Sequence, residues 1–136
     1  MTGRLAAALC AVMFAPVFGQ ADEARPRPDV GRLPISANAT AEEVALGDRI
    51  FHGEAAGGTC FQCHGWDAKG TTNGNDLTVG SLGWGESFSE IKATIKHNMA
   101  VAPGQDGDLT PADVHAVTAY VWGLVHQERI ARQAQR

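Results

Sequence analysis

The chemistry of this chain is concentrated in one short segment, residues 60–64, which reads Cys-Phe-Gln-Cys-His. Two cysteines separated by two residues and followed at once by a histidine are typical of covalent haem attachment. Each thiol can add to one vinyl group of a haem, and the imidazole that follows can bind the iron as its proximal ligand. The segment therefore predicts one haem c, with thioethers at Cys60 and Cys63 and with His64 on the iron.

Two other kinds of site use a similar pair of cysteines. A redox-active dithiol is expected near a strand–helix–strand pattern, and a four-ligand zinc site needs a second pair of cysteines or histidines. The sequence shows neither feature around Cys60 and Cys63. Haem attachment is therefore the prediction for this segment.

Residues 1–21 have the layout of a secretory signal peptide. Arg4 supplies a positive charge, residues 5–18 form an apolar run, and small residues surround a cleavage point after Ala21. The run is shorter than a membrane-spanning helix requires, and a retained anchor is the alternative. Cys10 lies inside this run after a leucine, which argues against a lipoprotein. We expect export to a bacterial periplasm, with no stable membrane span after the signal is removed.

Cleavage at that point leaves 115 residues, enough for one small domain. The formal net charge of the chain is −4, and it becomes −5 when Arg4 leaves with the signal. This acidic balance argues against nucleic acid, which requires a basic face, and against a general attraction to anionic membranes. Small exported domains commonly need a covalent staple, and here the haem is expected to provide it.

Capping residues followed by apolar residues at helical spacing mark the starts of three helices. These starts are Thr40, Ser87 and Thr110. Residues 65–85 are rich in Gly, Asn and Thr and predict a loop. No strand pattern of useful length appears, so the sequence predicts an all-α protein.

The same patterns divide the exported chain into three parts. Residues 22–39 contain Pro and Arg without apolar periodicity, which predicts an extended and largely disordered tail. Residues 40–130 form the predicted helical domain, and residues 131–136 form a predicted C-terminal tail.

Several segments together resemble the class I c-type cytochromes, the small monohaem proteins of bacterial periplasms. The resemblance runs from about residue 41 to residue 127, and its matching segments are residues 47–51, 60–65, 74–77, 109–114 and 119–124. It implies a small cytochrome c fold in which three main helices pack around one covalently attached haem. It also implies that the first and last helices cross where Gly47 allows a close approach to Tyr120.

The resemblance leaves several candidates for the sixth ligand of the iron. In the family it is usually a methionine directly before a proline, but residues 101–103 read Val-Ala-Pro here. Met99 is the only methionine outside the signal segment and is the expected distal ligand, with His97 as the alternative and an open position as a third option. Asn75 stands where the family often has a proline whose carbonyl orients the proximal histidine. The hydrogen bond to His64 is therefore a second open question.

Aromatic residues and the remaining histidines complete the set of candidates. Phe51, Trp84 and Tyr120 could line the haem, although ordinary core packing explains them equally well. The other histidines are expected at ordinary surface or helix positions: His52, His115 and His126.

A haem with histidine and methionine on its two faces has no position for a substrate, so the resemblance implies outer-sphere electron transfer. No Ser-His-Asp grouping, phosphate loop or paired carboxylates stand beside the haem segment, and we predict an electron carrier rather than an enzyme. The expected partners are redox proteins: a periplasmic dehydrogenase as donor, a terminal oxidase as acceptor, or both. A free shuttle and a dedicated dehydrogenase subunit both fit. The alternative is a haem enzyme or gas sensor with an open or displaceable sixth ligand.

Overall fold

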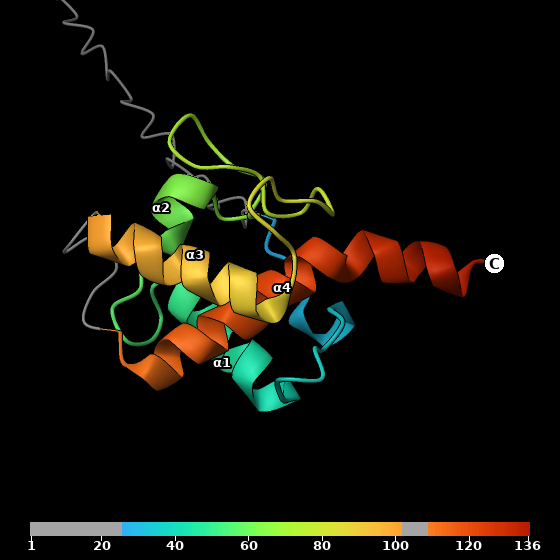
Figure 1. Cartoon of the computed structure of the whole chain (residues 1–136), viewed down its shortest axis with the longest axis horizontal. Coiled ribbons are helices and arrows are strands. Elements are labelled where there is room, and N and C mark those ends of the chain that lie inside the picture. Colours follow the sequence, from blue (N-terminus) through green and yellow to red (C-terminus); the bar gives the residue numbers. More distant parts are fainter. Residues whose placement is uncertain (1–25, 102–108) are drawn as a thin grey trace, which may run out of the picture.

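The computed structural model describes residues 26–101 and 109–136 (Figure 1). Residues 1–25, which hold the predicted signal segment and the start of the predicted tail, lie outside this description. The described elements are η1 (Val30–Arg32), a 3₁₀ helix, and four α-helices: α1 (Ala41–Phe51), α2 (Cys60–His64), α3 (Phe88–Val101) and α4 (Pro111–Ala134). Within these ranges the only β-type pairing is one isolated bridge between Thr71 and Gly74. The all-α prediction is confirmed.

The three long helices begin where the sequence predicted. The hydroxyl groups of Thr40 and Thr110 accept from the third residue of α1 and α4, and that residue's carboxylate accepts from the backbone N–H of the cap. Each pair satisfies two backbone donors that the helix itself leaves unpaired. Pro111 takes the first position of α4, where no N–H is needed. Ser87 caps α3 by accepting from the N–H of Glu90.

Helices α1 and α4 cross in close contact at Gly47, as the resemblance implied. A Cβ atom on Gly47 would lie 2.0 Å from the carbonyl oxygen of Ala116 and 2.8 Å from the Cβ of Tyr120. Only glycine allows the two backbones to approach this closely. Both helices contribute fully buried side chains to one core, among them Ile50 and Leu124.

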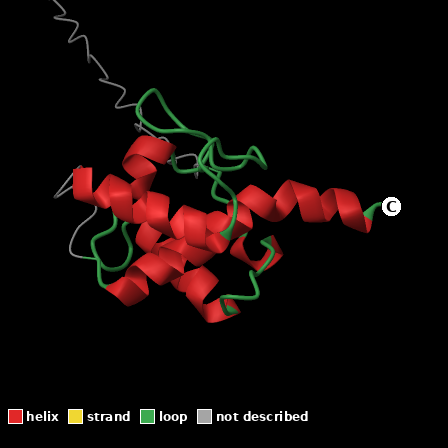
Figure 2. Cartoon of the chain, in the orientation of Figure 1, coloured by secondary structure: helices red, strands yellow, loops and turns green. Residues whose placement is uncertain are grey.

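Helix α3 packs against α4, and a long irregular segment joins α2 to α3 (Figure 2). Residues 65–87 contain neither helix nor strand, which agrees with the loop predicted over residues 65–85. Leu77 and Leu82 of this loop are buried in the core. The loop is therefore anchored by apolar side chains rather than by regular structure.

The N-terminal segment differs from the disordered tail that was expected over residues 22–39. From residue 26 onward it is packed on the domain, with Leu33 buried against Gly123 of α4. Arg27 forms ion pairs with acidic side chains of α1 and of the turn after it. The sequence pattern missed this packing because single tertiary contacts hold the segment, and such contacts leave no periodic signal.

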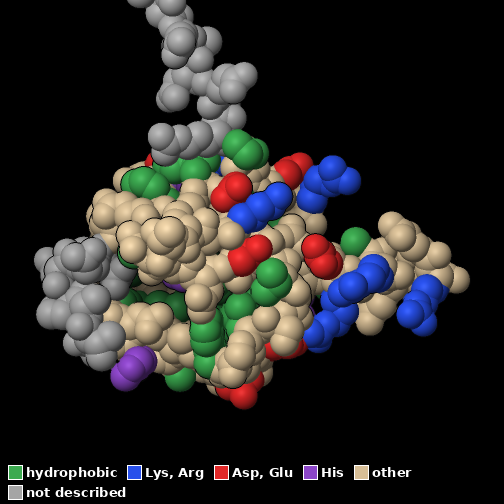
Figure 3. Space-filling model, turned by 90° about the horizontal axis from the view of Figure 1, so that it is seen from above, with side chains coloured by type: hydrophobic (Ala, Val, Ile, Leu, Met, Phe, Trp, Pro, Cys, Tyr) green, Lys and Arg blue, Asp and Glu red, His purple; other side chains and the backbone are tan. Residues whose placement is uncertain are grey.

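Helix α4 continues to Ala134, through most of the C-terminal tail predicted over residues 131–136. Its last residues are good helix formers without a breaker, so nothing ends the helix earlier. These last turns project beyond the body of the molecule and carry exposed basic side chains (Figure 3). Arg129 ties the helix to the loop, because it donates to the Gly80 carbonyl at 3.2 Å and pairs with Glu86. None of the helices in the described part of the chain is long and apolar enough to cross a membrane.

Candidate functional site

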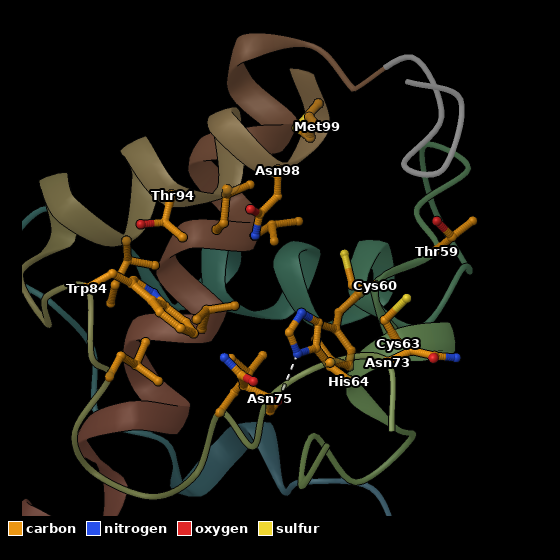
Figure 4. Close-up of a pocket in the computed structure, with 18 of the residues that line it drawn as sticks. Thr59, Cys60, Cys63, His64, Asn73, Asn75, Trp84, Thr94, Asn98 and Met99 are labelled. Atoms are coloured by element: carbon orange, nitrogen blue, oxygen red, sulfur yellow. Dashed lines mark hydrogen bonds between the residues drawn. The ribbon is translucent and has the colours of Figure 1, made fainter. Parts of the chain in front are cut away.

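A largely apolar cavity of about 630 Å³ opens between α2, α3, α4 and the loop that joins α2 to α3 (Figure 4). Its apolar lining includes six aliphatic side chains from the loop, α3 and α4: Leu77, Leu82, Ile91, Ile95, Val117 and Val121. The helical spacing of the last four was visible in the sequence. Which of these residues would face a cavity, however, depends on how α3 packs against α4.

Helix α2 carries the predicted attachment segment, and both of its cysteines line the cavity. Cys60 and Cys63 stand close to His64 (Figure 4), and they are not joined by a disulfide. Residues three apart lie on the same face of a helix, so this single turn places both thiols at the same opening. Thiols placed in this way can each form a thioether with one cofactor in the cavity.

The ring of His64 is oriented by a backbone carbonyl. Its Nδ1 lies 2.8 Å from the carbonyl oxygen of Asn75. A carbonyl oxygen can only accept, so Nδ1 donates, and in the neutral ring with this tautomer Nε2 carries the lone pair that a metal binds. The orienting hydrogen bond is therefore present, although Asn75 stands where the resemblance led us to expect a proline.

The loop after α2 is held against the backbone of Cys63 and His64 by short contacts. The hydroxyl of Thr71 donates to the carbonyl oxygen of Cys63 at 2.6 Å. The N–H of Gly70 donates to the carbonyl oxygen of His64 at 2.7 Å. A Cβ atom on Gly74 would lie 2.7 Å from the carbonyl oxygen of Cys63. Glycine at this position lets the loop pass directly against α2. The predicted proximal ligand is thus held through both its ring and its backbone.

Met99 lines the same cavity from the last turns of α3, across from the ring of His64 (Figure 4). It is half-buried, and it lies inside the helix rather than in a loop after it. His97 is exposed and does not line the cavity. The structure therefore brings Met99 to the cavity and leaves His97 outside it. Of the Val-Ala-Pro segment, Val101 ends α3, and residues 102–103 lie outside the described residues.

The three candidate aromatic residues are placed differently from one another. Phe51 is fully buried and lines the cavity, and Trp84 lines it while remaining 42 % exposed. Tyr120 does not line the cavity: it is fully buried beside Phe51, with the ring centres 5.4 Å apart. Burial, and then the negative charge of Asp48, raise the pKa of the Tyr120 phenol. Tyr120 therefore supports the cavity wall and does not form it.

Sequence reasoning missed a buried polar cluster at the end of α1. His52, which was expected at an ordinary surface or helix position, is only 3 % exposed. Its ring nitrogens contact Asp48 and the carbonyl of Trp66, and Arg27 pairs with the same Asp48 carboxylate. The spacing of Asp48 and His52, one helical turn apart, was the only signal of it in the sequence. Through the carbonyl of Trp66, the cluster contacts the backbone two residues after His64.

The residues of the cavity fit a covalently attached haem. The α2 side offers two thiols and an imidazole whose Nδ1 lies on the Asn75 carbonyl, the α3 side offers a thioether, and the walls between them are mainly apolar. These are the groups that a c-type haem and its iron bind. By contrast, no group of three or more His, Cys, Asp or Glu side chains within residues 26–101 and 109–136 is arranged to hold a bare metal ion. The zinc alternative has no ligand set there.

Comparisons with known proteins also indicate a c-type cytochrome. The family model for cytochrome c matches residues 44–124, which is more than half of the chain. The chain is 34% identical over 90 residues to the cbb3-type cytochrome c oxidase subunit CcoP of Rubrivivax gelatinosus, covering 61% of this chain and 26% of that protein. It is 29% identical over 108 residues to the corresponding subunit FixP of Rhizobium etli, covering 68% of this chain and 38% of that protein. The chain thus spans well under half the length of these relatives. No solved structure matches at a comparable level of significance.

Proposed function

Because this chain belongs to the cytochrome c family, and so carries covalently bound haem c, we propose that it is an electron carrier between redox proteins. The observation that carries the proposal is that His64 and Met99 line one apolar cavity from two sides. When bound, the haem supplies a one-electron ferric–ferrous couple. The residues of the chain determine how it is held and which oxidation state is favoured.

Each residue of the site has a defined part in this proposal. Cys60 and Cys63 would hold the haem through thioethers, and His64 would bind the iron through Nε2 while Nδ1 stays on the carbonyl of Asn75. That hydrogen bond fixes the ring and makes the imidazole a stronger ligand. Met99 would supply a thioether to the iron, and ligation of this kind would raise the reduction potential. With both ligand residues bound, no position on the iron would be left for a substrate, so the haem would supply electron transfer only.

The apolar walls complete the site by excluding water. Leu77, Ile91 and Val117 line the same cavity as the two ligand residues. A buried, apolar setting disfavours the more highly charged ferric state, so these walls raise the potential in the same direction as Met99. The site therefore suits a carrier on the oxidising side of a respiratory chain.

The proposed location is the bacterial periplasm, on the basis of the signal peptide predicted over residues 1–21. The donor is then a dehydrogenase or a respiratory complex, and the acceptor is a terminal oxidase. The two relatives named above are oxidase subunits, which supports an oxidase as acceptor. Co-purification with a dehydrogenase at near-equal stoichiometry would instead indicate a dedicated subunit. A protein recovered alone from periplasmic extracts would favour the free shuttle.

Absorption spectra of the haem-loaded mature protein test the proposal, with Met99→Ala and His97→Ala beside the wild type. We expect a low-spin wild type with the sulfur-to-iron charge-transfer band, and loss of that band in Met99→Ala alone. Carbon monoxide should bind the ferrous Met99→Ala protein and not the wild type. A high-spin wild type that binds carbon monoxide as readily as Met99→Ala would favour the haem enzyme or gas sensor.

A further inference from the structure

Beside the cavity, five side chains form what we term the His52 cluster: Arg27, Asp48, His52, Glu54 and Trp66. The guanidinium of Arg27 donates to both carboxylate oxygens of Asp48, at 3.1 and 2.5 Å, and to Glu54 at 2.5 Å. It also lies 5.9 Å from the centre of the Trp66 ring. The cluster therefore joins the N-terminal segment, the end of α1 and the loop after α2.

The surroundings of His52 suit a charged ring. Its Nδ1 lies 2.8 Å from the carbonyl oxygen of Asp48 and 3.0 Å from Oδ1 of the same residue, and its Nε2 lies 2.8 Å from the carbonyl oxygen of Trp66. All three oxygens accept hydrogen bonds. A neutral imidazole has one N–H and one lone pair, so one nitrogen would face an acceptor without a proton. The imidazolium donates from both nitrogens, with the Nδ1–H facing both Asp48 oxygens, so neither nitrogen faces an acceptor without a proton.

The cluster can hold this charge even though the side chain of His52 has no exposed surface. Burial opposes protonation of the ring, but the hydrogen bonds to Asp48 and Trp66 outweigh it, and the pKa of His52 is raised. Burial also opposes ionisation of Asp48, yet the hydrogen bonds from His52 and Arg27 keep its pKa below the usual value. A buried charge that is paired and hydrogen-bonded in this way is stable.

Two further titratable groups complete the surroundings of His52. Tyr120 of α4 has its ring centre 6.1 Å from that of His52, and its raised pKa keeps the phenol neutral. Glu54 pairs with Arg27 on the outer side of the cluster. With His52 protonated, the cluster contains two positive and two negative groups. With His52 neutral, it has a net charge of −1.

The cluster is in contact with the haem-attachment segment. Trp66 follows His64 by two residues, and its ring lies 4.6 Å from that of His52 and 5.3 Å from that of Phe61 in α2. The ring of Phe51 is near both histidines, with its centre 5.0 Å from that of His52 and 6.4 Å from that of His64. One side chain is therefore close both to the buried charge and to the predicted proximal ligand.

We propose that His52 is a positioning residue for the haem-attachment segment, and that its buried imidazolium raises the reduction potential of the haem held by His64. The inference rests on the proposed electron-transfer function and deepens it. His52 fixes the carbonyl of Trp66, and with it the turn that follows His64. Its charge disfavours the ferric state, which carries one more positive charge than the ferrous state. Loss of the proton at higher pH leaves the cluster negative and lowers the potential.

Redox titrations of the haem-loaded mature protein between about pH 5 and pH 10 test this inference. His52→Gln keeps an N–H donor for Trp66 but removes the charge, and His115→Gln is a matched control on α4. We expect the potentials of wild type and control to fall together as pH rises. His52→Gln should have a lower potential with a flatter profile, and at pH 6 a ferrous-to-ferric ratio about fivefold lower at the same applied potential. A His52→Gln protein that follows the wild type at every pH would overturn the proposal.

A second measurement needs no variant and applies even where His52→Gln fails to fold. Nitrogen NMR of the ferrous wild type, labelled at histidine, reports directly on the ring. We expect both nitrogens of His52 to be protonated at neutral pH, and a neutral ring would overturn the proposal. The sulfur-to-iron band tests Met99 separately, and His52→Gln should retain it. Failure of the electron-carrier proposal and failure of the His52 proposal are therefore distinguishable.

Discussion

The two sides of the cavity are built in different ways. On the α2 side, His64 is held by the carbonyl of Asn75, by the loop packed against its backbone and by the two cysteines of the same helix. On the α3 side, the candidate ligand is Met99, a half-buried thioether at the end of a helix. A thioether is flexible and makes only weak hydrogen bonds, so its position depends on packing alone.

This difference separates two properties of the site. The α2 side determines where the haem is attached and how firmly the surrounding chain is held. The α3 side determines what binds the sixth position of the iron. Changes on the α2 side should therefore affect folding and haem content, whereas changes at Met99 should affect potential and ligand binding with little effect on the fold.

Replacement of His64 by alanine should have the largest effect. It removes the predicted proximal ligand, and the apparent loss of stability should be at least about 3 kcal/mol because cofactor binding and folding are coupled. Haem content per protein and thermal unfolding by circular dichroism measure both consequences. A low-spin spectrum in His64→Ala, with unchanged stability, would contradict the role given to the α2 side.

Gly47→Ala should cost about 3 kcal/mol, because its new methyl group would overlap the Ala116 carbonyl at the crossing that supports both sides. Gly83→Ala is the matched control. A Cβ atom there has no neighbour within 4 Å, and the expected change is less than about 0.5 kcal/mol. Urea unfolding of the two haem-loaded variants gives the comparison. Equal midpoints would show that α1 and α4 can move apart at Gly47 without loss of stability.

Gly74→Ala should destabilise the protein by about 1–3 kcal/mol, because the methyl group would meet the backbone of Cys63. The same shift would move the neighbouring carbonyl of Asn75 away from His64. We therefore expect the reduction potential to change together with the unfolding midpoint. A loss of stability with an unchanged potential would show that the Asn75 hydrogen bond does not control the ligand.

Met99→Leu tests the α3 side. Leucine has a similar volume, so the free energy of unfolding should fall by less than about 1.5 kcal/mol. Without the thioether, the ferrous protein should bind carbon monoxide and its potential should drop. A large loss of stability without carbon monoxide binding would mean that Met99 acts in packing and not as a ligand.

Asn75→Ala should have the smallest effect, because the backbone carbonyl that accepts from His64 is retained. Surface-type substitutions of this kind change stability by about 0.5 kcal/mol or less. The potential and spectrum should stay close to those of the wild type. A marked change in either would assign a role to the amide side chain, which also lines the cavity.

Local signals in the sequence predicted much of the fold and most of the site. Caps at Thr40, Ser87 and Thr110 mark helix starts because they pair with residues only three positions away. The attachment segment is equally local, since both cysteines and the histidine lie within one helical turn. These features need no knowledge of how the helices pack.

The features that were missed depend on contacts between distant parts of the chain. Leu33 is buried only because α4 passes beside it, and Arg27 is ordered through a partner 21 positions away. His52 becomes buried where the end of α1 meets the carbonyl of Trp66. Tyr120 lies at the predicted crossing and packs beside Phe51, but it does not line the cavity. No periodic pattern encodes which side of a packed helix a cavity will occupy.

Because α4 is one continuous helix, it sets a fixed distance between the cavity and the C-terminal end of the chain. One helix runs from Val121 in the cavity wall to Ala134 in the projecting end. At 1.5 Å per residue, a label at Ala134 would sit about 20 Å along the axis from that wall. Arg129 holds the direction of this part of α4 relative to the loop through its contacts with the loop. A fluorophore or spin label attached at Ala134 would therefore report distances to the haem site from a position fixed by the helix.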